Sequence, residues 1–133
     1  MNRGTVFIVE DDESFAQLLK MRIESSGHRV CTTSNGSEAY DLIQTSHPDV
    51  VVLDVFLPDM DGLTILKRLK SPLDIETGKP SVTRNIPVVV LTGKAPMIEN
   101  MIRAEGGDDF FLKPVDVSKL VNRICKLLER KQK

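Results

Sequence analysis

Short apolar runs, each ending at a polar residue, recur along the chain. Runs of about four such residues without alternation are typical of strands buried on both faces of a parallel sheet. A first strand is predicted over 5–9, and a less apolar run over 29–33 fits a strand at the sheet edge. Four of the apolar runs are followed directly by polar residues or proline. They are Val6–Val9 with Glu10, Asp11 and Asp12, Val50–Leu53 with Asp54, Val88–Leu91 with Thr92, and Phe110–Leu112 with Lys113 and Pro114.

Segments with helical spacing lie between these runs. The first helix is predicted over 13–26, where Gly27 is typical of a residue that ends a helix. Ser37 is predicted to cap a helix that continues to about residue 45 and buries Ala39, Leu42 and Ile43. Five strands alternating with five helices predict an α/β fold with right-handed crossovers and a parallel sheet covered on both faces. The remaining helices are predicted over 63–70, 96–104 and 117–128.

Length and composition indicate one globular domain spanning residues 1–133. The chain is 41% hydrophobic and 28% charged, with a net charge of -1. It lacks the basic surplus that binding to a phosphate backbone requires, so direct nucleic acid binding by this domain is not expected. Cys31 and Cys125 lack the spacing of a disulfide framework or a zinc site. Without a signal segment or a membrane span in the sequence, a cytoplasmic location is expected.

The polar residues that end the runs are predicted to meet at one edge of the sheet. In an open parallel sheet the ligand crevice lies outside the carboxyl ends of the strands. Because carboxylates that lie close together repel one another, a site containing Glu10, Asp11 and Asp54 favours a bound cation. Oxygen ligands without His or Cys indicate a hard ion, Mg²⁺ above all. Asp12 and Glu13 have a simpler explanation, because acids that follow a strand often cap the next helix.

Asp54 has the setting of a nucleophile, because it stands alone at the end of a continuous apolar run. A metal-bound carboxylate can attack phosphorus and form an acyl phosphate. Thr92 would then hydrogen-bond one phosphoryl oxygen, and Lys113 would pair with another. A single Thr or Lys at a strand end carries little information, and Asp54 alone could be a cap or turn residue. Only the joint pattern indicates phosphoryl chemistry.

Four segments, 7–12, 49–62, 87–93 and 106–114, together resemble the receiver domain of two-component response regulators over nearly the whole chain. The resemblance implies a flavodoxin-like, doubly wound sheet with strand order 2-1-3-4-5. It implies a phosphorylation-dependent switch, not a turnover enzyme, that accepts a phosphoryl group on Asp54 from a histidine kinase or histidine phosphotransfer protein. An unidentified output partner would bind the face made by the fourth helix, fifth strand and fifth helix. Phosphorylation could also lead to a homodimer. No membrane partner is expected.

The resemblance also assigns roles to individual residues. Phe110 is placed as the aromatic side chain that moves on activation, although it could equally be a plain core residue. The other implied roles are Asp11 and Asp54 as direct Mg²⁺ ligands, Glu10 as a ligand through water, Phe56 as a ligand through its backbone carbonyl, Thr92 as the switch hydroxyl, Lys113 as the phosphate-binding ammonium, and Pro114 as the residue that shapes the turn of Lys113, with a cis bond between the two as one way to do so.

The chain departs from the usual receiver pattern at three places. An extended loop over 71–85 lengthens the connection before the fourth strand, either as a tolerated mobile loop or as a partner contact on the flank of that strand. Phe56 is bulky and Lys94 is cationic, and both positions overlook the phosphoryl group in the family. Phe56 is therefore expected to restrict the attacking water and slow loss of the phosphate.

Other functions fit the sequence less well. Phosphatases of the haloacid dehalogenase type carry a second Asp at the position that Phe56 occupies here. A P-loop nucleotide binder would need a glycine-rich segment with Lys after the first strand, where this chain has acids. The alternative that stays open is a receiver-like interaction module that is not phosphorylated.

Overall fold

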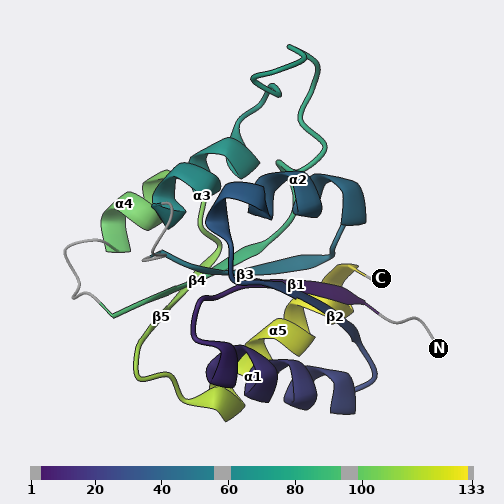
Figure 1. Cartoon of the computed structure of the whole chain (residues 1–133), viewed down its shortest axis with the longest axis vertical. Coiled ribbons are helices and arrows are strands. Elements are labelled where there is room, and N and C mark those ends of the chain that lie inside the picture. Colours follow the sequence, from purple (N-terminus) through teal and green to yellow (C-terminus); the bar gives the residue numbers. More distant parts are fainter. Residues whose placement is uncertain (1–3, 56–60, 94–98, 132–133) are drawn as a thin grey trace.

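The chain folds around a five-stranded parallel sheet whose strand order is β2-β1-β3-β4-β5 (Figure 1). The computed structural model describes residues 4–55, 61–93 and 99–131. The order and the parallel pairing confirm the predicted fold class. The elements are β1 Thr5–Val9, α1 Glu13–Ser25, β2 Arg29–Thr33, α2 Gly36–Ser46, β3 Val50–Asp54, α3 Gly62–Lys70, β4 Val88–Thr92, α4 Glu99–Ala104, β5 Asp109–Leu112 and α5 Val117–Lys131.

Helices cover both faces of the sheet, with α2, α3 and α4 on one side and α1 and α5 on the other (Figure 1). Because side chains alternate along a strand, each inner strand contributes to two hydrophobic cores. In β3, Val51 and Leu53 pack in the core beneath α2 and α3. Val50 and Val52 pack in the core with α1 and α5. This two-sided burial explains why β3 and β4 are apolar at nearly every position.

The edge and centre of the sheet were predicted correctly. The strand β2 lies at one edge, and its Arg29, Cys31 and Thr32 are exposed. The strand β3 is the middle strand, and all five of its residues are buried. The start of the predicted fourth helix, residues 96–98, lies outside the described residues. Among the described helices, none has both the length and the apolar content needed to cross a lipid bilayer.

Two predictions for α2 were wrong. Asn35, not Ser37, caps the helix, because the Asn35 side chain accepts hydrogen bonds from the backbone N–H and the hydroxyl of Ser37. Leu42 is 38% exposed, whereas Tyr40 is buried in its place. At 100° per residue, Leu42 points away from the stripe that faces the sheet. The Asp12 prediction is confirmed, since its carboxylate accepts from the backbone N–H of Phe15 at the start of α1.

Residues 71–85, which we call the insertion, join α3 to β4 and project beyond α2 and α3 at the top of Figure 1. An antiparallel bridge pairs Leu73 with Pro80. Within the turn, the Asp74 N–H donates to the Lys79 carbonyl and the Gly78 N–H donates to the Asp74 carbonyl, each at 2.8 Å. Gly78 has φ +70, which a side chain would strain. The insertion is therefore a hydrogen-bonded turn.

Candidate functional site

The carboxyl ends of the parallel strands lie level with one another. Val9 pairs in register with Leu53, Leu53 with Val90, and Thr92 with Leu112. The residues at or just after these ends therefore meet at one edge of the sheet, as predicted. They are Glu10 and Asp11 after β1, Asp54 at the end of β3, Thr92 at the end of β4, and Lys113 after β5.

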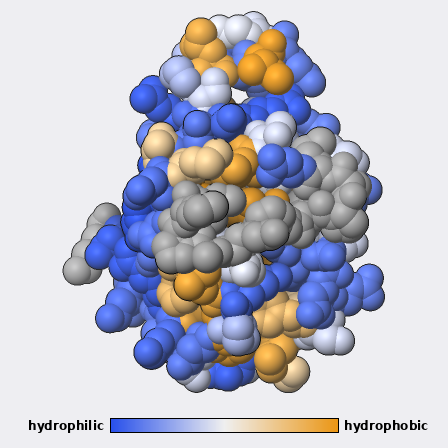
Figure 2. Space-filling view, turned by 90° about the vertical axis from the view of Figure 1, so that its left-hand side faces the viewer, coloured by the Kyte–Doolittle hydropathy of each residue, from blue (hydrophilic) through white to orange (hydrophobic). Residues whose placement is uncertain are grey.

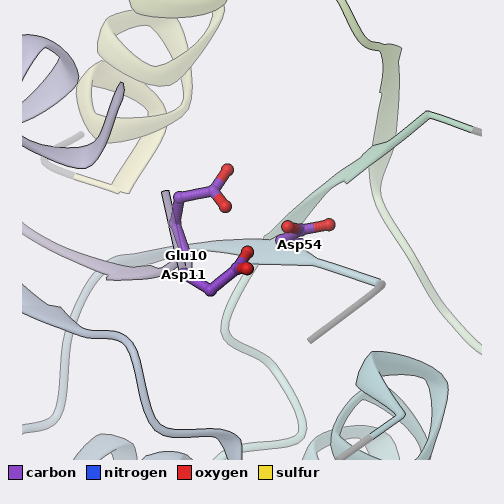
Figure 3. Close-up of side chains that lie close together, drawn as sticks. All are labelled: Glu10, Asp11 and Asp54. Carbon is purple, nitrogen blue, oxygen red and sulfur yellow. The ribbon is translucent and has the colours of Figure 1, made fainter. Parts of the chain in front are cut away.

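Three carboxylates gather at this edge. Glu10, Asp11 and Asp54 each offer an oxygen within 4.8 Å of the others (Figure 3). Glu10 is 1% exposed and Asp54 is 3% exposed, whereas Asp11 is open to solvent. Oxygen donors of this charge and spacing fit a hard divalent cation, and Asp11 leaves the cluster accessible from solvent.

Lys113 provides positive charge for this cluster. Its Nζ lies 2.8 Å from Glu10 Oε1 and 3.0 Å from Asp54 Oδ2. The Lys113 backbone N–H donates to the Thr92 carbonyl, which fixes the loop after β5 against the end of β4. The peptide bond from Lys113 to Pro114 is cis. Burial lowers the pKa of Lys113, but the hydrogen bonds to Glu10 and Asp54 outweigh burial and raise it overall.

Among the three carboxylates, Glu10 is the one whose pKa burial raises most clearly. Desolvation raises the pKa of Glu10 to about 7, the hydrogen bond with Lys113 acts in the opposite direction, and the neighbouring Asp54 raises the pKa further. Its second oxygen accepts from the backbone N–H of Asp12 at 3.2 Å. One ammonium thus pairs with two of the three carboxylates in the cluster, so an additional cation would relieve the repulsion between them.

The remaining predicted site residues have different surroundings. Thr92 is fully buried. Phe110 is half-buried on β5 and packs against the core beneath α3 and α4, as a core aromatic would. Pro114 is exposed. Phe56 and Lys94 lie outside the described residues.

Sequence reasoning missed a groove beside Lys113. It encloses about 280 Å³ between the start of α1 and the loop that leads into α5. One signal for the groove was available in the sequence: Phe15 follows Asp12 by three residues, so both lie on the same side of the first turn of α1. The lining residues are Asp12, Phe15, Lys113, Pro114, Val115 and Val117.

A second missed residue is Gly62, the first of α3. A Cβ at this position would lie 2.5 Å from both the Asp54 carbonyl oxygen and the Val55 Cα. The Gly62 N–H also donates to the Val55 carbonyl at 2.7 Å. Only glycine allows α3 to begin this close to the backbone of Asp54.

Known proteins share this sequence and fold. The chain matches the response regulator receiver domain family over residues 6–125. The probable transcriptional regulatory protein TcrX of Mycobacterium tuberculosis is 36% identical over 128 residues, which cover 95% of this chain and 50% of TcrX. The chain spans about half the length of the curated relatives it matches.

Solved receiver domains have the same architecture. The receiver domain of the Francisella response regulator 1452 is 30% identical, with a TM-score of 0.80 and coverage of 97% of this chain and 99% of that one. The BeF3-activated N-terminal receiver domain of Klebsiella pneumoniae RstA is 26% identical, with a TM-score of 0.75 and coverage of 93% and 97%. With its parallel sheet, its acidic strand ends and these matches, the chain belongs to the response regulator receiver domains.

Proposed function

We propose that residues 1–133 form one receiver domain that acts in the cytoplasm as a phosphorylation-dependent switch, with Asp54 as the phosphoacceptor. The donor is a sensor histidine kinase or a histidine phosphotransfer protein. The observation that carries the proposal is the position of Asp54 at the end of the central strand, next to Lys113 and two further carboxylates. The similar receiver domain of RstA is known in a BeF3-activated form, and the existence of an activated form fits a switch.

The reaction is a transfer of one phosphoryl group. A carboxylate oxygen of Asp54 forms a bond to phosphorus while the bond from phosphorus to the donor's imidazole nitrogen breaks. The electron pair of that bond stays on the imidazole, and an acyl phosphate forms on Asp54. Lys113, now 3.0 Å from Asp54, would pair with a phosphoryl oxygen, and Thr92 would donate its hydroxyl to another.

The acidic cluster fits Mg²⁺ as a cofactor. Asp11 and Asp54 would hold the ion directly and Glu10 through water, with the backbone carbonyl of Phe56 as a further ligand. Bound Mg²⁺ supplies positive charge that stabilises the transferring phosphoryl group. Phe56 and Lys94 would tune how long the phosphate persists, Phe56 by limiting the access of water.

The output of the switch would pass through Thr92 and Phe110. A phosphoryl group adds charge and acceptor oxygens at Asp54, and Thr92 moving toward them would leave space for the half-buried Phe110. This movement would change the face formed by α4, β5 and α5, where an output partner or a second copy would bind. Pro114 would shape the turn that carries Lys113.

The phosphodonor would dock on the groove beside Lys113. A donor must bring its phosphoryl group to Asp54, so it must contact the rim of the site. The groove offers the apolar side chains of Phe15, Val115 and Val117 there, next to the Lys113 ammonium. Such a combination of apolar surface and charge suits a protein partner.

Phosphorylation can be tested by incubating the protein with Mg²⁺ and acetyl phosphate and measuring its intact mass. We expect the gain of one phosphoryl group, lost in Asp54→Asn and on removal of Mg²⁺ with a chelator. Asp41→Asn, which changes an exposed aspartate on α2, should leave the gain intact. No gain with any donor would favour the unphosphorylated interaction module instead.

A further inference from the structure

The insertion is anchored to the body of the domain through the carboxylate of Asp74. One oxygen accepts from the Tyr40 hydroxyl at 3.2 Å and from the Gln44 amide at 3.1 Å, both on α2. The other oxygen accepts from the backbone N–H groups of Glu76 at 2.8 Å and Thr77 at 3.2 Å. This one side chain therefore shapes the turn and attaches it to α2.

A second set of contacts attaches the insertion to α3. Arg68 lies 3.8 Å from the centre of the Tyr40 ring and pairs with Glu76 at 3.1 Å. The Thr83 hydroxyl, which is fully buried, donates to the Leu69 carbonyl at 2.7 Å. Contacts from two helices hold the insertion in one conformation before any partner binds, so a partner need not supply the cost of ordering it.

The anchored insertion exposes aliphatic side chains. Ile75 is 72% exposed, Val82 58% and Leu73 52%. Figure 2 shows hydrophobic surface at the top of the molecule, over the insertion, with hydrophilic surface around it. Hydrophobic side chains gathered at one projecting end of a molecule make that end a candidate binding surface.

The insertion and the part of α3 next to it together carry more positive than negative charge. Lys79 and Arg84 on the insertion, and Lys67 on α3, are exposed, and within the described residues none of them has an ion-pair partner. The two acids of the insertion are Glu76, which pairs with Arg68, and Asp74, whose hydrogen-bond donors are neutral, so Asp74 keeps its negative charge and offsets one of these three cations. The chain as a whole has a net charge of -1, so this positive region is local.

We propose that the insertion is a preformed docking surface for a partner protein that presents aliphatic and acidic side chains. A second copy of this chain would bring like charges together at the same surface. An anionic membrane would meet the Glu76 carboxylate beside Ile75, and the three exposed apolar residues include no aromatic side chain to anchor it at a lipid interface. An acidic, aliphatic protein segment fits both the charge and the apolar residues.

This docking does not depend on phosphorylation. The side chains that anchor the insertion are Tyr40, Gln44, Arg68, Asp74 and Thr83, and none belongs to the acidic cluster. The surface should bind equally well in the Asp54→Asn variant. The docking proposal can therefore be tested independently of the phosphorylation switch proposed above.

The test is an NMR titration of the full chain with a short synthetic peptide rich in Glu and Leu, and with the same peptide carrying Lys for Glu. We expect the acidic peptide to shift backbone signals over residues 73–84 and near Lys67, and the basic peptide to leave them unchanged. Ile75→Asp should weaken binding by about tenfold or more, because it removes an apolar contact and adds a like charge. Met21→Asp, at a comparably exposed apolar residue of α1, should not change the affinity.

Charge reversal supplies a second variant that leaves the anchoring contacts in place. Lys79→Glu combined with Arg84→Glu should abolish most of the binding and its dependence on salt concentration. The proposal is overturned by no shift up to the solubility of the acidic peptide, or by shifts confined to the groove beside Phe15. Binding to phosphatidylserine vesicles that Ile75→Asp removes, or self-association through the insertion, would also overturn it.

Discussion

Two buried carboxylates, Glu10 at the strand ends and Asp74 in the insertion, differ in how their charge is stabilised. Asp74 receives hydrogen bonds from two backbone N–H groups, a phenol hydroxyl and an amide. These hydrogen bonds lower the pKa of Asp74, and the bond from the Glu76 N–H contributes most. Burial acts in the opposite direction but does not outweigh them. Desolvation instead raises the pKa of Glu10 to about 7.

The difference separates an acid that anchors a turn from an acid of the candidate functional site. Neutral donors hold Asp74 as an isolated anion that needs no cation. Glu10 shares one ammonium with Asp54 and lies beside a third carboxylate, so negative charge there is only partly balanced. A binding site benefits from that imbalance, because an arriving cation gains from relieving it. The Asp74 anchor benefits instead from a charge that its hydrogen-bond donors already stabilise fully.

The helix α3 connects the two regions, because it begins against the backbone of Asp54 and ends at the insertion. Gly62→Ala should have the largest effect on stability, lowering the free energy of unfolding by about 3 kcal/mol, since the new methyl group would overlap backbone atoms at 2.5 Å. Urea denaturation measures this change. Gly93→Ala is the matched control, because a Cβ there meets nothing within 4 Å. Equal stability of the two variants would show that α3 can shift freely at its start.

Lys113→Met tests the imbalance at the strand ends directly. Removing the ammonium leaves Glu10 and Asp54 without their cation, and we expect a loss of about 2 kcal/mol, less than for a fully buried pair because the Lys113 side chain is 31% exposed. Mg²⁺ should restore part of this stability, as thermal unfolding with and without the ion would show. Lys126→Met on the exposed side of α5 should have neither effect. A stability loss that Mg²⁺ does not change would contradict a cation site at the carboxylates.

Acid should release the Asp74 anchor with a smaller effect. The folded pKa of Asp74 is lowered, so its contribution is complete above the ordinary carboxyl range and is lost as the pH falls through the folded pKa. Tyr40 is the only tyrosine in the chain, so its ring signals in NMR report on the anchor alone. We expect these signals to change only at pH values below about 4.

The matched variant for the acid experiment is Asp74→Asn, which retains the shape of the side chain without its charge. Its Tyr40 signals should stay nearly constant through the acid range. If variant and wild type changed together, the transition would belong to unfolding of the whole domain and not to this anchor.

Much of the site could be predicted because topology, not detailed packing, brings it together. Lys113 contacts Glu10 and Asp54 across 103 and 59 residues of sequence, yet each residue follows or ends an apolar strand that the sequence shows plainly. Once the strands are parallel and in register, their ends must meet. The same reasoning correctly placed β2 at the edge and β3 in the centre.

Features that depend on particular side-chain contacts were missed. The bond from Tyr40 to Asp74 joins residues 34 apart in segments without a shared sequence period. The insertion has no apolar alternation, because its conformation comes from hydrogen bonds of one aspartate to the backbone. The prediction of Leu42 for the buried face of α2 failed for a different reason, because a rotation of 100° per residue from Ala39 and Ile43 selects Tyr40.

The bridge between Leu73 and Pro80 has a practical consequence, because the chain leaves and re-enters the domain at one point. A tag or reporter domain inserted within residues 75–78 would therefore leave the rest of the fold in place, but it would cost hydrogen bonds to Asp74 and cover the docking surface at Ile75. Lengthening a closed loop costs only about 0.6 kcal/mol per doubling, provided that Asp74 and Lys79 are kept to close it. Such a graft would sit at the end of α3 remote from Asp54, where it could mark the receiver without blocking the proposed phosphorylation site.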